Sequence, residues 1–211
     1  VSHDADTCFN FINLLRQQES VKGFPSEVLP STAFYFSRQS ITDWTSLLSY
    51  GGMQASATAG RTTEMQERNR ELSGYLMENT GHDLVACLFQ QEDTLQGVAA
   101  VLSLSVLDVT EAERKLRSLV NTAPAEEGVK TPRITFCYTA NKAYSVYRLS
   151  QTTLFAQLTT FVEPTSYMYA VFYGGRLLLA PDEGSLSRYI RQLDKGDVLD
   201  GAIAYRAGMD S

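Results

Sequence analysis

The chain has few of the residues that metal-dependent and histidine-dependent catalysis requires. Its 211 residues include two histidines, His3 and His82, which lie far apart in the sequence and have no pattern of further ligands nearby. Three cysteines, Cys8, Cys87 and Cys137, have spacings that match no zinc motif, and Cys87 lies in the apolar run LVACLF, which is typical of a buried strand. We therefore expect no metal site. We also expect that none of the three thiols is needed for activity, metal binding or an intramolecular disulfide.

Signatures of nucleophilic catalysis and of phosphate binding are also missing from the sequence. No serine lies in a Gly-x-Ser-x-Gly elbow, and neither glycine pair, Gly51-Gly52 or Gly174-Gly175, is followed by the Lys-Ser or Lys-Thr of a phosphate-binding loop. Gly184-Ser185 lies where a helix is expected to begin, so its amides could hold an anion, but serine at that place is more typical of a helix cap. We predict that the protein is not an enzyme, has no catalytic residue and takes no cofactor.

The sequence also lacks a positive charge excess and a long hydrophobic run. The formal net charge is -6, which argues against a nucleic-acid partner, because phosphate backbones are bound by clustered lysine and arginine. The longest nearly apolar run, residues 97–107, is shorter than the roughly 20 residues that a membrane-spanning helix needs. Hydrophobic residues make up 44% of the chain, which is enough for a sizeable core. We expect a folded protein whose sequence, as shown, does not cross a membrane.

What the sequence does contain is a regular pattern of strands and turns. Tyr167, Tyr169, Val171 and Tyr173 alternate with smaller residues, and Gly174-Gly175 supplies the two left-handed positions of a tight hairpin. Because neighbouring runs are separated by hairpin-length turns, we expect a mostly antiparallel arrangement. The strands are predicted at residues 33–37, 84–90, 98–105, 134–138, 144–149, 167–173 and 176–180.

Helical spacing of apolar residues is found between these strands. The helices are predicted at residues 8–15, 41–48, 62–81, 110–120, 152–162 and 186–195, with a cap at residues 108–110. The apolar residues that recur at helical spacing beside polar neighbours are Trp44, Leu47, Leu48, Leu116, Leu119, Tyr189, Ile190 and Leu193. We expect these side chains to face the sheet.

A strand, a capped turn and an amphipathic helix follow one another three times, at residues 34–52, 101–120 and 176–196. Hairpins that alternate with helices indicate an α+β fold, here a mainly antiparallel sheet with helices packed on one face. We assign residues 1–27 to an N-terminal helix and connecting arm. Residues 28–211 are assigned to a single α+β domain that continues beyond the sequence shown.

Two segments carry a resemblance to a known family. LPSTAFYFS, at residues 29–37, is followed by a helix that begins near Ile41, and YAVFYGGRLLLAPDEGSLSRYIRQLDKGDVL, at residues 169–199, is followed by small residues. This combination resembles a family of unknown function found in membrane-anchored envelope proteins of Bacteroidetes-type bacteria, and the likeness covers most of residues 28–205. The resemblance implies an anchor upstream of the sequence shown, a location outside the cytoplasm and no assigned activity. It supplies no functional residue.

Tyrosines are the best candidates for a binding site. Eleven tyrosines are present, and six of them lie on predicted strands that we expect to be neighbours: Tyr138, Tyr144, Tyr147, Tyr167, Tyr169 and Tyr173. Tyrosine has an apolar ring and a polar hydroxyl group, so these residues suit a half-buried sheet face and a binding patch alike. By contrast, the glutamates of residues 64–78 alternate with arginines and indicate an exposed helix face that carries ion pairs.

From these observations we expect a non-catalytic interaction or assembly module of a bacterial envelope protein, located outside the cytoplasm and bound to a protein partner. The alternative is a small-molecule or glycan-binding module that uses the aromatic sheet face, and a third reading is a cofactor-free hydrolase. A flat, exposed aromatic patch would favour the first function. A deep cleft with convergent carboxylates would favour one of the other two.

Overall fold

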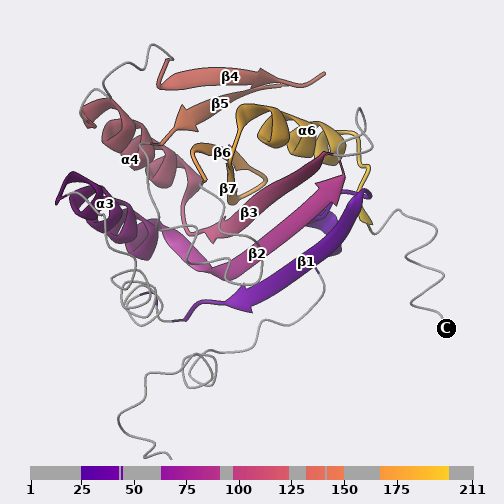
Figure 1. The fold of residues 1–211 in the computed structure, drawn as a ribbon, viewed down its shortest axis with the longest axis horizontal. Coiled ribbons are helices and arrows are strands. Elements are labelled where there is room, and N and C mark those ends of the chain that lie inside the picture. Colours follow the sequence, from indigo (N-terminus) through magenta and orange to yellow (C-terminus); the bar gives the residue numbers. More distant parts are fainter. Residues whose placement is uncertain are drawn as a thin grey trace, which may run out of the picture.

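The computed structural model describes residues 25–42, 44, 63–90, 97–123, 132–140, 142–149 and 167–199 (Figure 1). A short 3-10 helix, η1 (Ser26–Val28), precedes the sheet. The described α-helices are α3 (Thr63–Asn79), α4 (Val109–Thr122) and α6 (Glu183–Asp194). The described strands are β1 (Ala33–Ser40), β2 (Thr80–Gln90), β3 (Val98–Val106), β4 (Ile134–Tyr138), β5 (Ala143–Arg148), β6 (Tyr169–Tyr173) and β7 (Arg176–Ala180).

These strands form one seven-stranded sheet in the order β1-β2-β3-β7-β6-β5-β4. Every neighbouring pair is antiparallel. Three hairpins, β2–β3, β4–β5 and β6–β7, account for half of the neighbouring pairs, and the pairing of β3 with β7 joins the two halves of the sheet (Figure 1). The predicted α+β class with a mainly antiparallel sheet is confirmed.

Predicted and observed strands agree most closely where the residues that form the turn are adjacent in the sequence. The two strands beside Gly174-Gly175 begin or end where predicted, and both glycines have positive φ, +55° and +79°, as a tight two-residue hairpin requires. β1 is longer than expected and continues to Ser40. Its polar end pairs with the beginning of β2, so partner contacts extend a strand that the sequence pattern alone would end at residue 37.

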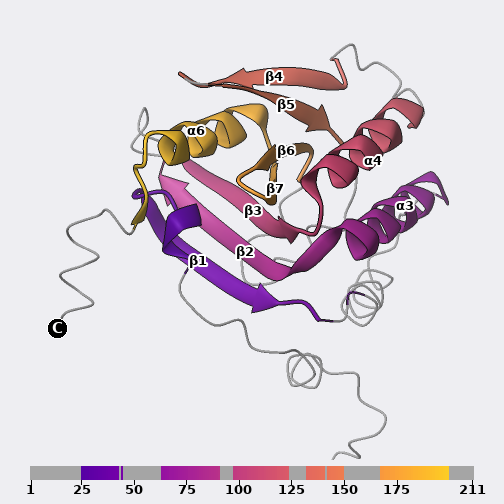
Figure 2. The same cartoon turned by 180° about the vertical axis from the view of Figure 1, so that it is seen from behind.

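The helices cover both faces of the sheet, so the expectation that they pack on one face is wrong. Alternation along β2 places Leu84 and Ala86 in a core cluster with α3 and α4, whereas Val85 and Cys87 lie in a second cluster with α6. We call these the α3/α4 cluster and the α6 cluster. Figures 1 and 2 show α3 beside α4, with α6 apart from them against β3, β6 and β7. Strands that are apolar at nearly every position need cover on both faces, which explains this arrangement.

Helices α4 and α6 both begin with an aspartate cap. The Asp108 side chain accepts a hydrogen bond from the amide of Glu111 at 3.1 Å, and Asp182 accepts one from the amide of Ser185 at 2.8 Å. The cap predicted at residues 108–110 is therefore confirmed. The cap predicted at Gly184-Ser185 is wrong, because Ser185 lies inside α6 and its hydroxyl group donates to Asp182. Aspartate at the residue before a helix accepts from amides that have no partner within the helix.

The residues predicted to face the sheet are largely in the core. Trp44, Leu116, Tyr189, Ile190 and Leu193 are buried, and Leu119 is partly buried against the α3/α4 cluster. Leu47 and Leu48, the helices predicted at residues 8–15 and 152–162, and Cys8 lie outside the described residues. None of the described helices has the length and apolar character needed to cross a membrane.

Candidate functional site

The six candidate tyrosines lie in three different environments. Two of them are buried in the α3/α4 cluster, three are half-buried against the α6 cluster, and one is exposed. The first group is Tyr147 and Tyr167, the second is Tyr144, Tyr169 and Tyr173, and the exposed residue is Tyr138. Alternation along a strand separates the first two groups, since Tyr144 and Tyr147 are three residues apart on β5 and point to opposite faces. The tyrosines therefore do not form one binding patch.

Tyr147 has a structural role in the α3/α4 cluster. Its hydroxyl group donates to Glu113 Oε1 at 2.6 Å and accepts from Arg117 Nη2 at 3.0 Å, and both partners are on α4. The Arg117 guanidinium also lies 5.8 Å from the centroid of the tyrosine ring. Burial and the hydrogen bond to Glu113 raise the pKa of Tyr147. These contacts attach α4 to the face of β5.

Tyr144 and Tyr173 form a pair that is held by one carboxylate. Their hydroxyl groups donate to Asp194 Oδ1 at 3.2 and 2.9 Å, and the ring centroids are 5.4 Å apart at an interplanar angle of 45°. Lys142 Nζ lies 5.2 Å from the centroid of the Tyr144 ring. Burial opposes the charge of Asp194, but hydrogen bonds from Thr139, Tyr173 and Tyr144 and the charge of Lys142 outweigh it, so the pKa of this carboxylate is lowered. We call this pair, with Asp194, the tyrosine clamp.

Tyr144 and Tyr173 are also among the residues that line a cavity of about 540 Å³ near the ends of β5 and β6. The pairing of these strands begins at Val146 and Val171, although β5 begins at Ala143 and β6 ends at Tyr173. The lining residues come from α4, the β4–β5 turn, β5, β6 and the β6–β7 hairpin: Val109, Glu113, Lys142, Ala143, Tyr144, Ser145, Phe172, Tyr173, Gly174 and Gly175. We call this space the β5/β6 cavity. It brings two of the six predicted tyrosines together with Glu113 and Lys142, which the sequence did not single out.

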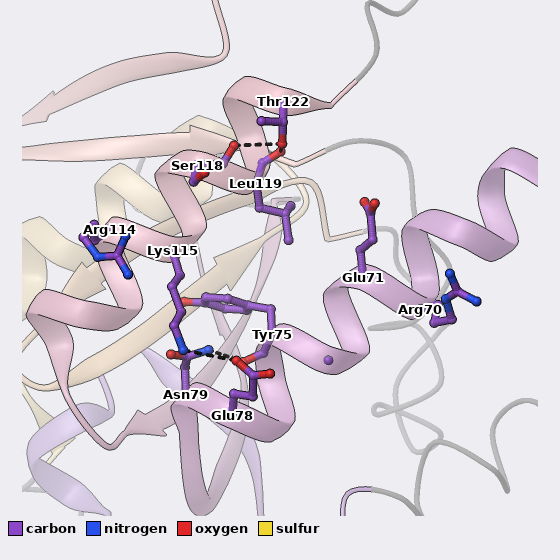
Figure 3. A pocket seen from close by; sticks show the side chains of 11 residues that line it. Arg70, Glu71, Tyr75, Glu78, Asn79, Arg114, Lys115, Ser118, Leu119 and Thr122 are labelled. Carbon is purple, nitrogen blue, oxygen red and sulfur yellow. Dashed lines mark hydrogen bonds and ion pairs between the residues drawn. The ribbon is translucent and has the colours of Figure 1, made fainter.

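A second hollow, of about 460 Å³, lies between α3 and α4 (Figure 3). Tyr75 lies between the two helices and donates from its hydroxyl group to the backbone oxygen of Ala112 at 3.1 Å. An ion pair between Lys115 and Glu78, 3.1 Å long, joins the two helices. The charged residues around this hollow carry both signs, and its two α4 cations, Arg114 and Lys115, are paired with Glu111 and Glu78. Glu78, part of the exposed, ion-paired face predicted for residues 64–78, thus helps to hold α3 to α4.

The edge of the sheet at β4 exposes two aromatic side chains. Phe136 is 54% exposed and Tyr138 is 65% exposed, and their ring centroids are 6.4 Å apart. Among the described strands, β4 is the last of the sheet and pairs only with β5. Its sequence, ITFCY, contains no charge and no proline. Phe136 was not among the predicted site residues, although its alternation with Ile134 and Tyr138 could have identified it.

No family model, curated protein or solved structure matches the chain. The function of the protein is therefore inferred from the surfaces described above, and the envelope family suggested by residues 29–37 and 169–199 stays a proposal.

Within the described part of the chain, the histidine and the two cysteines are engaged or buried. His82 Nδ1 lies 2.8 Å from the backbone oxygen of Ile41. Cys87 and Cys137 are buried free thiols, and burial raises the pKa of Cys87 to about 12. Among the described residues, no three histidine, cysteine or acidic side chains are grouped as metal ligands. A thiol with so high a pKa is protonated at neutral pH and is a poor nucleophile.

One charged network within the sheet was missed by sequence reasoning. Asp83 on β2 accepts from Arg38 Nε of β1 at 2.6 Å and from Arg176 Nη1 of β7 at 2.8 Å. Arg176 also donates to the backbone oxygen of Ser103 on β3 at 3.1 Å. Burial opposes the charge of Asp83, but hydrogen bonds from the two guanidinium groups hold the pKa of this carboxylate below its ordinary value. The network links four adjacent strands and has a structural role.

Proposed function

We propose that the chain is a non-catalytic protein-interaction module that binds a partner polypeptide along the free edge of β4. The single observation that supports this function is the exposed pair Phe136 and Tyr138 on an uncharged edge strand. We further propose that the module belongs to a bacterial envelope protein and acts outside the cytoplasm. That location rests on the resemblance carried by residues 29–37 and 169–199.

The two edges of the sheet differ in a way that supports binding at β4. Proteins protect exposed edges with charges, proline or bulges, because a free edge offers backbone groups to any other strand. β1, at the opposite edge, has a bulge between Ala33 and Tyr35 and holds Arg38 in an ion pair with Asp83. β4 has no bulge in its pairing with β5. An edge without protection is expected where a partner strand is accommodated.

The chemistry of β4 indicates what kind of partner it accepts. An extended segment that pairs with β4 would form backbone hydrogen bonds, and its alternate side chains would lie beside Phe136 and Tyr138. Cross-strand pairs with aromatic residues contribute roughly 0.2–1 kcal/mol each, so two such pairs select aromatic or β-branched side chains at every second position. The proposed partner is therefore a polypeptide with an extended segment in which apolar and polar residues alternate.

Selection from a random-peptide library tests this function. The wild-type protein should enrich peptides with alternating aromatic or β-branched residues, and the double variant F136S/Y138S should not retain them. Phe34, which is 60% exposed on β1, provides the matched control, since F34S removes an exposed aromatic residue from the other edge. Peptides that bind F136S/Y138S as well as the wild type would contradict the proposal.

A second function, the binding of a small molecule, is favoured by the β5/β6 cavity. Its volume of about 540 Å³ is in the usual range of ligand pockets, and its lining combines polar groups from α4 and the β4–β5 turn with apolar residues of the sheet. This function corresponds to the small-molecule or glycan-binding alternative. No observation on the described residues favours the cofactor-free hydrolase.

A further inference from the structure

We propose that the partner polypeptide at β4 is a second copy of this chain, paired antiparallel with the first so that Phe136 of one copy lies directly opposite Phe136 of the other. This inference rests on the proposed function, the contact along the free edge of β4, and names the partner. The two sheets would then continue into each other across a twofold axis, with the same surface contributed by both copies.

The pairing of β4 with β5 determines which backbone groups β4 offers to another strand. The amide of Thr139 donates to the carbonyl oxygen of Lys142 at 2.9 Å, and at the other end of the pair the amide of Arg148 donates to that of Arg133 at 2.8 Å. In an antiparallel pair such bonded positions alternate with positions whose backbone groups point away from the neighbouring strand. The positions of β4 that point away from β5 are Ile134, Phe136 and Tyr138.

These three outward positions define one self-complementary register. Two antiparallel strands form their close hydrogen-bonded pairs only where outward positions lie opposite each other. With Phe136 opposite Phe136 of the second copy, Ile134 of each copy lies opposite Tyr138 of the other, and every outward position is paired. A shift of two residues in either direction leaves one outward position of each copy without a partner. The register centred on Phe136 therefore uses the edge most completely.

The side chains of β4 suit this register. Residues directly opposite each other lie on the same face, so the two Phe136 rings would meet and each Tyr138 ring would lie beside Ile134. Aromatic pairs and pairs of an aromatic with a β-branched residue are favourable, so β4 itself has the alternation expected of its partner. The other face of β4 is occupied within the chain, since Thr135 donates to Glu183 at 3.0 Å and Cys137 is buried in the α6 cluster.

Like charges do not meet in this arrangement. β4 has no charged residue, and the nearest one in the sequence, Arg133, would lie opposite Thr139 at either end of the paired segment. The Arg133 guanidinium also donates to the backbone oxygen of Val120 at 2.7 Å, which holds it on its own chain. The alternative occupant, β1 of a second copy, is a poorer match, because its bulge interrupts the register of the strand.

Charge pairing at position 136 tests the inference, with sedimentation velocity of the full chain as the measurement. The wild type should be a dimer. F136K and F136E each place like charges directly opposite each other and remove the aromatic pair, so each should raise the dissociation constant of the dimer at least about tenfold. An equimolar mixture should dimerise again, because each lysine then lies opposite a glutamate. F34K and F34E make the same changes at an exposed phenylalanine on β1 and should remain dimers.

Oxidative crosslinking of F136C and Y138C tests the register separately. The two thiols of F136C would lie directly opposite each other, with Cα atoms about 5.5 Å apart, which a disulfide can span. Those of Y138C would be displaced by four residues, roughly 14 Å along the strands, which a disulfide cannot span. A linked dimer is expected from F136C and not from Y138C, and the wild type gives the background of the native cysteines.

Other results would overturn the inference. A dimer that persists in F136K and F136E, or that the mixture does not restore, would place the contact elsewhere, and open-ended assembly would indicate pairing of β4 with β1. A monomeric wild type that still enriches alternating peptides would overturn the inference while the proposed function stood, whereas a monomer that retains no peptide would contradict both. Phe136 is 54% exposed, so its substitution leaves the core intact, and F136C decides the register even if a charged variant fails to fold.

Discussion

The hydroxyl group of Tyr173, at the end of β6, donates a hydrogen bond of 2.9 Å to Asp194 Oδ1, at the end of α6. With the matching bond from Tyr144, it ties the last turn of α6 to two adjacent strands of the sheet. The two rings also pack on each other, with centroids 5.4 Å apart. The packing of α6 against β5 and β6 therefore depends on one carboxylate.

The hydrogen bond between Tyr147 and Glu113 should contribute measurably to stability. Y147F keeps the buried ring and removes the hydroxyl group, so we expect the free energy of unfolding to fall by about 1 kcal/mol, the usual net value of such a bond. Urea denaturation followed by circular dichroism measures the change. Y138F, which removes the hydroxyl group of an exposed tyrosine, should leave the unfolding midpoint unchanged, and an equal loss in both variants would refute the role of the bond.

The Asp83 network predicts a pH-dependent stability. The pKa of Asp83 is lowered in the folded state, so its contribution is present above the unfolded pKa and is lost as the pH falls through the folded pKa. D83N leaves Arg38 and Arg176 without their carboxylate and should lower the free energy of unfolding by about 2 kcal/mol at neutral pH, less than for a fully buried pair because Asp83 is 16% exposed.

The difference between D83N and the wild type should begin to shrink below about pH 4, the ordinary pKa of aspartate in the unfolded chain, and should be lost as the pH falls through the lower pKa of folded Asp83. Thermal unfolding across this pH range measures it. D108N is the matched control, since asparagine also caps a helix and the change should cost little. A D83N deficit that stays constant to the acid limit would show that the side chain contributes through its shape and not through its charge.

How far the sequence predicted the fold depends on how local each signal was. The strands beside Gly174-Gly175 and the cap at Asp108 were predicted correctly, because the residues that determine them are neighbours in the chain. Placement of α6 was not predicted, since the face that a helix covers is decided by strands distant in sequence. Of the tyrosine clamp, only Tyr144 and Tyr173 were predicted as site residues, and Asp194 was not. Asp194 is 50 residues from Tyr144 and 21 from Tyr173, and nothing in a single sequence links an aspartate at a helix end to those strands.

Thiol accessibility tests the expectation that the cysteines have no chemical role. Cys87 and Cys137 are buried, so both should react with a thiol reagent far more slowly in the native protein than after denaturation. Denatured protein prepared without reductant should contain three free thiols per chain, one for each cysteine of the sequence. A single free thiol would reveal a disulfide, and a stoichiometric metal in elemental analysis would contradict the non-catalytic function.

Site-specific photocrosslinking tests the proposed interaction at β4 most directly. A benzoyl-phenylalanine placed at position 136 in the native host should crosslink to one partner polypeptide, and Y138S in the same protein should reduce the yield. The same group at position 34 is the control, because Phe34 is a comparably exposed aromatic residue on the opposite edge of the sheet. We predict a discrete crosslinked product from position 136 and none from position 34. The same products from both positions, or no product from position 136, would contradict the account.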